Sequence, residues 1–144
     1  MSPAVVCDTS GLLAGFDRRH PQHGAVARIL RDDPGPFLLS PLVMTEIDYL
    51  LGDRFGGAAV RQFYTDVLAG AYEVAELSGA DLRAVVEVAD QYLDMGLGLA
   101  DASNVVVAAR YGTVRLLTLD ETHMRAVRPL SHGTAFVLLP ADQV

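Results

Sequence analysis

The chain contains no lysine, because all eleven of its basic residues are arginine. A Walker phosphate loop, a Schiff-base enzyme and a phospho-receiver domain each depend on a lysine, so its absence excludes these three classes. Cysteine is nearly absent as well, since Cys7 stands alone. A single cysteine cannot form an internal disulfide, which agrees with a reducing compartment.

Long hydrophobic runs are also missing. Hydrophobic residues make up 51% of the chain, but they come in short runs such as residues 4–7 and 114–119. A membrane-spanning helix needs about 18 apolar residues, so we expect no membrane segment. The N-terminal sequence MSPAVVCD lacks the basic and apolar regions of a secretion signal, which leads us to expect a cytoplasmic protein. A length of 144 residues fits one domain spanning residues 1–144.

Hydrophobic periodicity predicts short strands separated by helices. The expected strands cover residues 4–7, 37–39, 72–77, 114–119 and 135–139. The expected helices cover residues 9–16, 21–31, 41–51, 58–68, 79–94, 100–111 and 121–127. Strands that alternate with helices imply crossover connections. We therefore predict an α/β protein with three α/β/α layers and a mostly parallel central sheet of about four to five strands.

Four acidic residues stand where a hydrophobic run gives way to a turn or a helix: Asp8, Glu46, Asp101 and Asp120. Two of them follow predicted strands and two lie just inside predicted helices, so all four are expected at the carboxyl edge of the sheet. Clustered carboxylates repel one another unless a divalent cation or shared protons compensate. Because oxygen-rich sites suit Mg²⁺ or Mn²⁺, the pattern predicts a metal site.

The formal net charge of −7 argues at first against nucleic acid, whose binding relies on basic patches. Four acids that surround two divalent cations would form a nearly neutral site, however, and such a site accepts phosphate. Two Mg²⁺ ions about 4 Å apart can hold a phosphodiester between them. The hydroxyls expected to orient ligands or waters there belong to Thr9, Ser10, Ser103 and Thr118.

Four segments of the chain resemble, in this order, those of PIN-domain ribonucleases and in particular of the VapC toxins: VVCDTSGLLAGF, SPLVMTEIDYLL, YLDMGLGLADASNVVVAARYG and VRLLTLDETHM. The resemblance covers most of the chain and implies a PIN-like fold. It implies an Mg²⁺- or Mn²⁺-dependent endoribonuclease that hydrolyses RNA phosphodiester bonds. It further implies the toxin of a type II VapBC toxin–antitoxin system, with a cognate VapB-type antitoxin and a homodimer as expected assemblies.

The resemblance assigns catalytic and metal-binding roles to the four acids. Asp8 matches the acid after the first strand, Glu46 the acid in the helix after SP, and Asp101 the acid that opens the ADAS helix. Asp120 matches the acid that ends the TLD segment, which is expected to reach metal through water or only with substrate present. Asp94 matches an acid that often precedes the ADA motif and is a secondary candidate.

Each acid also has an ordinary structural interpretation. Asp101 can cap its helix, Asp8 and Asp120 can form turns, and Glu46 can favour the positive end of its helix dipole. The joint pattern favours function over these roles. Other positions retain the structural interpretation: a solvated helix start for His20 and His23, a turn for His123, a core position for Cys7 and a solvated surface for the arginines.

Two other functions remain open from the sequence. One is a PIN-like metal-dependent nuclease outside any toxin pair, and the other is a catalytically silent PIN scaffold that binds partners. A phosphatase of the haloacid dehalogenase type does not fit, because Asp8 is not followed by a second aspartate two residues on. The RNA target also remains open, since transfer, ribosomal and messenger RNA present the same phosphodiester.

Overall fold

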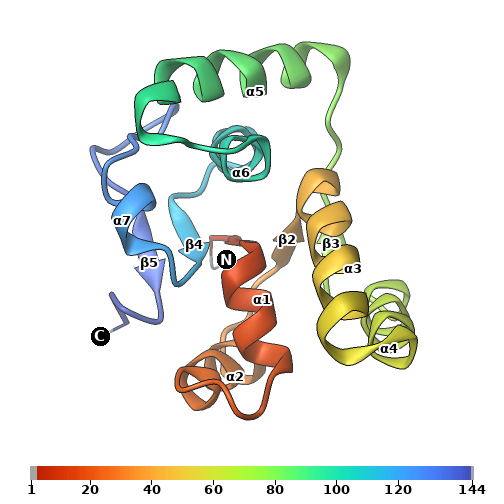
Figure 1. The fold of residues 1–144 in the computed structure, drawn as a ribbon. Helices are drawn as coiled ribbons and strands as arrows, with labels where there is room; N and C mark the ends of the chain where they lie inside the picture. Colours follow the sequence, from red (N-terminus) through yellow and green to blue (C-terminus); the bar gives the residue numbers. More distant parts are fainter. Residues whose placement is uncertain (1–2, 144) are drawn as a thin grey trace.

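A computed structural model describes residues 3–143 and contains a five-stranded parallel sheet at its centre (Figure 1). The strand order is β3-β2-β1-β4-β5, and every neighbouring pair is parallel. The strands are β1 (Val5–Cys7), β2 (Phe37–Leu39), β3 (Glu73–Val74), β4 (Arg115–Leu117) and β5 (Val137–Leu139). The predicted parallel α/β sheet is thus confirmed, with β3 at one edge. The predicted domain range includes residues 1, 2 and 144, which lie outside the described part.

Seven α-helices and one 3₁₀ turn are described between residues 3 and 143. They are α1 (Thr9–Phe16), α2 (His23–Asp32), α3 (Pro41–Phe55), α4 (Gly57–Leu68), α5 (Gly79–Gln91), η1 (Leu93–Met95), α6 (Leu99–Arg110) and α7 (Glu121–Met124). None of these described helices is long and apolar enough to cross a bilayer. Figure 1 shows α5 and α6 on one side of the sheet and α1 and α2 on the other, so the three predicted layers are present.

Side chains of β1 alternate between two hydrophobic cores. Val6 packs into the core that contains residues of α5 and α6, whereas Val5 and Cys7 pack into the core formed with α1 to α4. All three side chains are fully buried, as expected for a central strand of a parallel sheet. The predicted core position of Cys7 is confirmed, and burial raises the pKa of its thiol.

Two helices begin at the predicted capping residues. The Ser40 hydroxyl accepts a hydrogen bond from the backbone N–H of Leu42, with Pro41 in the first turn of α3. A capping box opens α5, in which Ser78 and Asp81 each accept from the other's backbone N–H. The local sequence therefore determines where α3 and α5 start.

In the sequence, Leu82, Val85, Val86, Ala89 and Leu93 recur at helical spacing, which predicts one apolar stripe over residues 79–94, and this prediction is wrong in part. Leu82, Val86 and Leu93 are 45%, 50% and 69% exposed, while Val85 and Val88 are the buried residues of this helix. The physical reason is that α5 packs on α6 rather than on the sheet, so only a narrow stripe is covered. The apolar stripes of α3 and α4 enter the core, where Ile47, Leu51 and Phe63 are buried.

Candidate active site

The fold places the four predicted acids around the carboxyl ends of neighbouring strands. Asp8 directly follows β1, and Asp120 follows β4 and caps α7. Glu46 lies inside α3, which begins after β2, and Asp101 lies in the first turn of α6. The four residues are far apart in the sequence, and the adjacency of β2, β1 and β4 brings them together.

The protonation behaviour of Asp101 shows that the acids share one electrostatic environment. Its pKa is raised to about 7, first by burial and then by the negative charges of Asp8, Asp120 and Glu46. A hydrogen bond with Asp8 raises it further, because this bond favours a protonated Asp101 carboxyl. We refer to these four residues as the acid cluster.

Asp8 is held by two hydroxyl groups. Its Oδ2 accepts hydrogen bonds from Ser10 Oγ at 2.9 Å and from Thr118 Oγ1 at 2.8 Å, and the residue is only 6% exposed. Ser10 Oγ accepts in turn from the backbone N–H of Leu119, and Thr118 Oγ1 from that of Asp120. These bonds tie the end of β1 to the end of β4 and fix the orientation of the Asp8 carboxylate.

A third hydroxyl reaches Glu46. Thr9 Oγ1 donates to Glu46 Oε1 at 2.5 Å, which connects the start of α1 to α3 although Glu46 itself is exposed. Ser103 differs from the other three predicted hydroxyls, because it contacts no acid. It donates to the Ala100 carbonyl and lies 2.6 Å from Ser40 Oγ, so its contacts are structural.

Asp120 is bound through both carboxylate oxygens to His123, which the spacing after Asp120 allows to approach the site although a turn is the preferred interpretation of the sequence. Oδ1 accepts from the backbone N–H of His123 at 3.0 Å, and Oδ2 lies 2.8 Å from His123 Nδ1. His123 Nε2 lies 3.0 Å from the Met95 carbonyl oxygen. Asp120 is the main cause of a raised pKa for His123. The three-residue spacing after a capping aspartate was the sequence signal for this contact.

Other candidates from the sequence lie apart from the acid cluster. Asp94 is exposed in η1 and is not among the charges that raise the pKa of Asp101. The interpretation of Asp101 as a helix cap is wrong, because Gly98 occupies that position. His20 and His23 make local contacts, with the Gln22 backbone and the Ala14 carbonyl respectively.

Six arginines are candidates for contacts with RNA phosphate, and three of them are already paired with acids. Arg110 binds Asp81, Arg115 binds Asp33, and Arg125 binds both Glu121 and Asp142. Within residues 3–143 no ion pair involves the remaining candidates, Arg18, Arg19 and Arg128. The three arginines without an ion pair in this part of the chain therefore lie after α1 and after α7.

The acid cluster has the donor chemistry of a hard-cation site. The groups that act on Asp101 are carboxylates, whose oxygens are preferred by Mg²⁺ and Mn²⁺. Across residues 3–143, no three His, Cys, Asp or Glu side chains are arranged closely enough to hold an ion as they stand. The donor types therefore fit a divalent cation, and coordination requires these side chains to move closer together.

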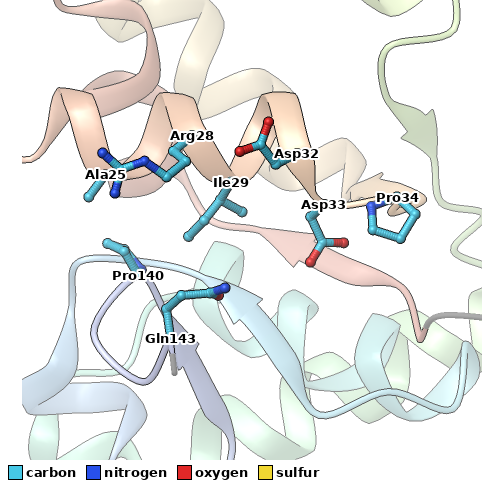
Figure 2. Close-up of a pocket in the computed structure, with 8 residues that line it drawn as sticks. All are labelled: Ala25, Arg28, Ile29, Asp32, Asp33, Pro34, Pro140 and Gln143. Atoms are coloured by element: carbon cyan, nitrogen blue, oxygen red, sulfur yellow. The ribbon is translucent and has the colours of Figure 1, made fainter.

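A cavity beside α2 lies away from the acid cluster. It measures about 430 Å³ and is bounded by α2 on one side and by Pro140 and Gln143 on the other (Figure 2). A second cavity of about 230 Å³ shares Ala25 and Pro140 with it and is also lined by Thr118 and Leu119. No acid of the cluster lines either cavity, although the second reaches the end of β4, close to the cluster.

Comparisons with known proteins agree with this fold. Residues 5–128 match the PIN domain family. The chain is 38% identical over 136 residues to Ribonuclease VapC26 of Mycobacterium tuberculosis. The match covers 94% of this chain and the whole of that protein. The chain therefore belongs to the PIN domain family, and within it to the VapC-type proteins.

Solved structures show the same fold at lower sequence identity. The crystal structure of VapC20 from Mycobacterium tuberculosis, described as a Sarcin-Ricin loop cleaving toxin, has a TM-score of 0.75 at 20% identity. It covers 81% of this chain and 90% of its own. VapBC2 from Rickettsia felis, solved with a DNA fragment from its promoter, has a TM-score of 0.63 at 14% identity. The match covers 89% of this chain and 96% of that chain.

Proposed function

We propose that this chain is a divalent-metal-dependent endoribonuclease of the VapC type, the toxin of a VapBC toxin–antitoxin pair. Membership of the PIN family and the identity with a VapC ribonuclease support this function. The single observation in the structure that carries it is the placement of the four acids around the carboxyl ends of β1, β2 and β4, and their proximity raises the pKa of Asp101. Such mutual repulsion has an evident use where a cation replaces the shared proton.

In the proposed site, Asp8, Glu46 and Asp101 hold Mg²⁺ or Mn²⁺. Asp120 completes the negative charge around the ion. A cation held there would supply charge neutralisation for the phosphate and would lower the pKa of the attacking water. Hydrolysis by in-line attack leaves a 5′-phosphate and a 3′-hydroxyl on the RNA. An attack by water needs no histidine or lysine nucleophile, which agrees with the absence of lysine.

The protein side chains have distinct parts in this reaction. Ser10 and Thr118 bind one oxygen of Asp8 and so orient the other one for the cation. Thr9 holds Glu46 toward the start of α1. Arg18 and Arg19, exposed after α1, are proposed contacts for the phosphates of the RNA backbone.

The proposal predicts that Asp101→Asn abolishes Mg²⁺-dependent RNA cleavage. Asp94→Asn is the matched control, because it makes the same change at an exposed acid a few residues earlier. Cleavage of a defined RNA is measured for both variants over a range of Mg²⁺ concentrations. Wild-type rates for Asp101→Asn at saturating Mg²⁺ would contradict the proposed function.

The proposed partners are an RNA substrate, a VapB-type antitoxin and a second copy of the chain. Expression of the toxin without the antitoxin should arrest growth, and Asp8→Asn should remove the arrest. Co-expression of the antitoxin should restore growth and yield a stable complex on size-exclusion chromatography. Sequencing of RNA 5′ ends after brief induction, with Asp8→Asn as control, identifies the cleaved RNA.

A further inference from the structure

The Asp120 carboxylate has no oxygen free of His123. The backbone N–H of His123 binds Oδ1 at 3.0 Å, and the imidazole Nδ1 lies 2.8 Å from Oδ2. Among the acids of the cluster, Asp120 is thus the one with both oxygens held by a single neighbouring residue. This arrangement limits the rotation of the carboxylate and its direct approach to a cation.

The same imidazole also contacts the segment that leads into α6. His123 Nε2 lies 3.0 Å from the carbonyl oxygen of Met95, at the end of η1. Only the short stretch 96–98 separates Met95 from α6, which carries Asp101 in its first turn. Gly96 in that stretch has a φ of 73°, a left-handed conformation that suits glycine. His123 therefore joins the chain around Asp120 to the chain that precedes Asp101.

We propose that His123 is a positioning residue, which fixes the orientation of the Asp120 carboxylate and holds it beside Asp101. This inference rests on the proposed metal-dependent nuclease and adds a residue to its site. His123 itself does not touch substrate. Residues that orient metal-binding carboxylates usually change metal affinity or activity about 10- to 100-fold when they are replaced.

Two substitutions separate the two ring contacts of His123. In His123→Asn the amide nitrogen occupies the place of Nδ1, so the bond to Asp120 is kept and the contact with Met95 is lost. In His123→Gln the amide nitrogen occupies the place of Nε2, so the contact with Met95 is kept and the bond to Asp120 is lost. Positioning through Asp120 predicts that only His123→Gln is impaired, and that His123→Asn restores function relative to it.

Tyr92→Phe provides a control for simple loss of structure. The Tyr92 hydroxyl accepts from the backbone N–H of Arg128 at 3.1 Å, which is a second link between the η1 region and the chain after α7. This link does not involve Asp120. If His123 only holds the two segments together, His123→Asn, which loses the contact with Met95, should be impaired, and Tyr92→Phe should resemble it.

The test measures Mn²⁺ binding by electron paramagnetic resonance for the full chain and each variant, together with kcat and KM for RNA cleavage. For His123→Gln we expect Mn²⁺ affinity and kcat to fall by roughly tenfold, with KM unchanged. His123→Asn and Tyr92→Phe should stay close to wild type. Equal values for His123→Gln and wild type would overturn the inference, as would equal losses in all three variants.

A double substitution keeps the inference falsifiable if His123→Gln also lowers stability. In an Asp120→Asn background, adding His123→Gln should cause no further loss of Mn²⁺ affinity, because His123 acts through Asp120. An independent, additive loss would contradict this. Failure of the proposed function would instead appear as wild-type protein without metal-dependent RNA cleavage, whereas the Mn²⁺ comparison tests His123 separately.

Discussion

The hydroxyl oxygens of Ser40 and Ser103, 63 positions apart in the chain, lie 2.6 Å from each other in the protein interior. Because Ser103 donates its proton to the Ala100 carbonyl, Ser40 is the donor in this pair. Ser40 also caps α3, which carries Glu46, while Ser103 belongs to α6, which carries Asp101. One buried contact therefore connects the starts of two helices that supply the acid cluster.

Ser103→Ala should lower the free energy of unfolding by about 1–3 kcal/mol, because it leaves the buried Ser40 hydroxyl without an acceptor. Urea denaturation followed by circular dichroism measures this change. Ser131→Ala is the matched control, since Ser131 is exposed and its hydroxyl contacts only the neighbouring His132. The importance of the contact is contradicted if the two variants are equally stable.

Thr118→Val should weaken Mn²⁺ binding by roughly tenfold, because it removes a hydroxyl that orients Asp8. The two side chains have nearly the same shape, so the effect reports the hydrogen bond. Thr118→Ser keeps the hydroxyl and should restore binding. If the serine variant binds Mn²⁺ as poorly as the valine variant, the Thr118 hydroxyl alone does not account for the orientation of Asp8.

The stability of the metal-free protein should fall as pH rises from about 4 to about 7. The Asp101 pKa is about 7 in the folded state, above the value of about 3.9 for an unfolded aspartate. In this interval the folded state binds more protons than the unfolded state, so deprotonation favours unfolding. Thermal midpoints measured at several pH values without metal test this expectation.

Asp101→Asn serves as the control for the pH dependence. It removes the titrating group, so the difference in midpoint between wild type and variant should change across this pH range. His123 also has a raised pKa and contributes stability that is lost as pH rises, but it is present in both proteins. A difference that does not vary with pH would exclude the shifted Asp101 as the cause.

Gly11→Ala should strongly destabilise the protein. A Cβ at position 11 would lie 2.6 Å from the carbonyl oxygen of Leu117, which belongs to β4 and cannot move without disturbing the sheet. Gly24→Ala makes the same change in α2, where a Cβ meets nothing within 4 Å, and should stabilise by about 0.5–1 kcal/mol. Thermal midpoints of both variants test the pair, and a similar midpoint for both would contradict the close approach of α1 to β4.

Much of the fold could be predicted from local pattern. The strand at Val5–Cys7 and the helix start at Ser40 follow from a short apolar run and from an N-cap followed by proline, both of which act within a few residues. The exposure of Leu82 and Val86 could not be predicted in this way. It depends on which neighbour α5 meets, and periodicity contains no information about that neighbour.

The same distinction between local pattern and tertiary structure applies to the candidate site. The chain alone identifies Asp8, Glu46, Asp101 and Asp120, because each acid stands at a recognisable strand or helix boundary. The raised pKa of Asp101 and the contact of His123 with the Met95 carbonyl were decided by the tertiary structure. Both depend on distances across the edge of the sheet, and these distances arise only when β1 and β4 pair and α6 packs above them.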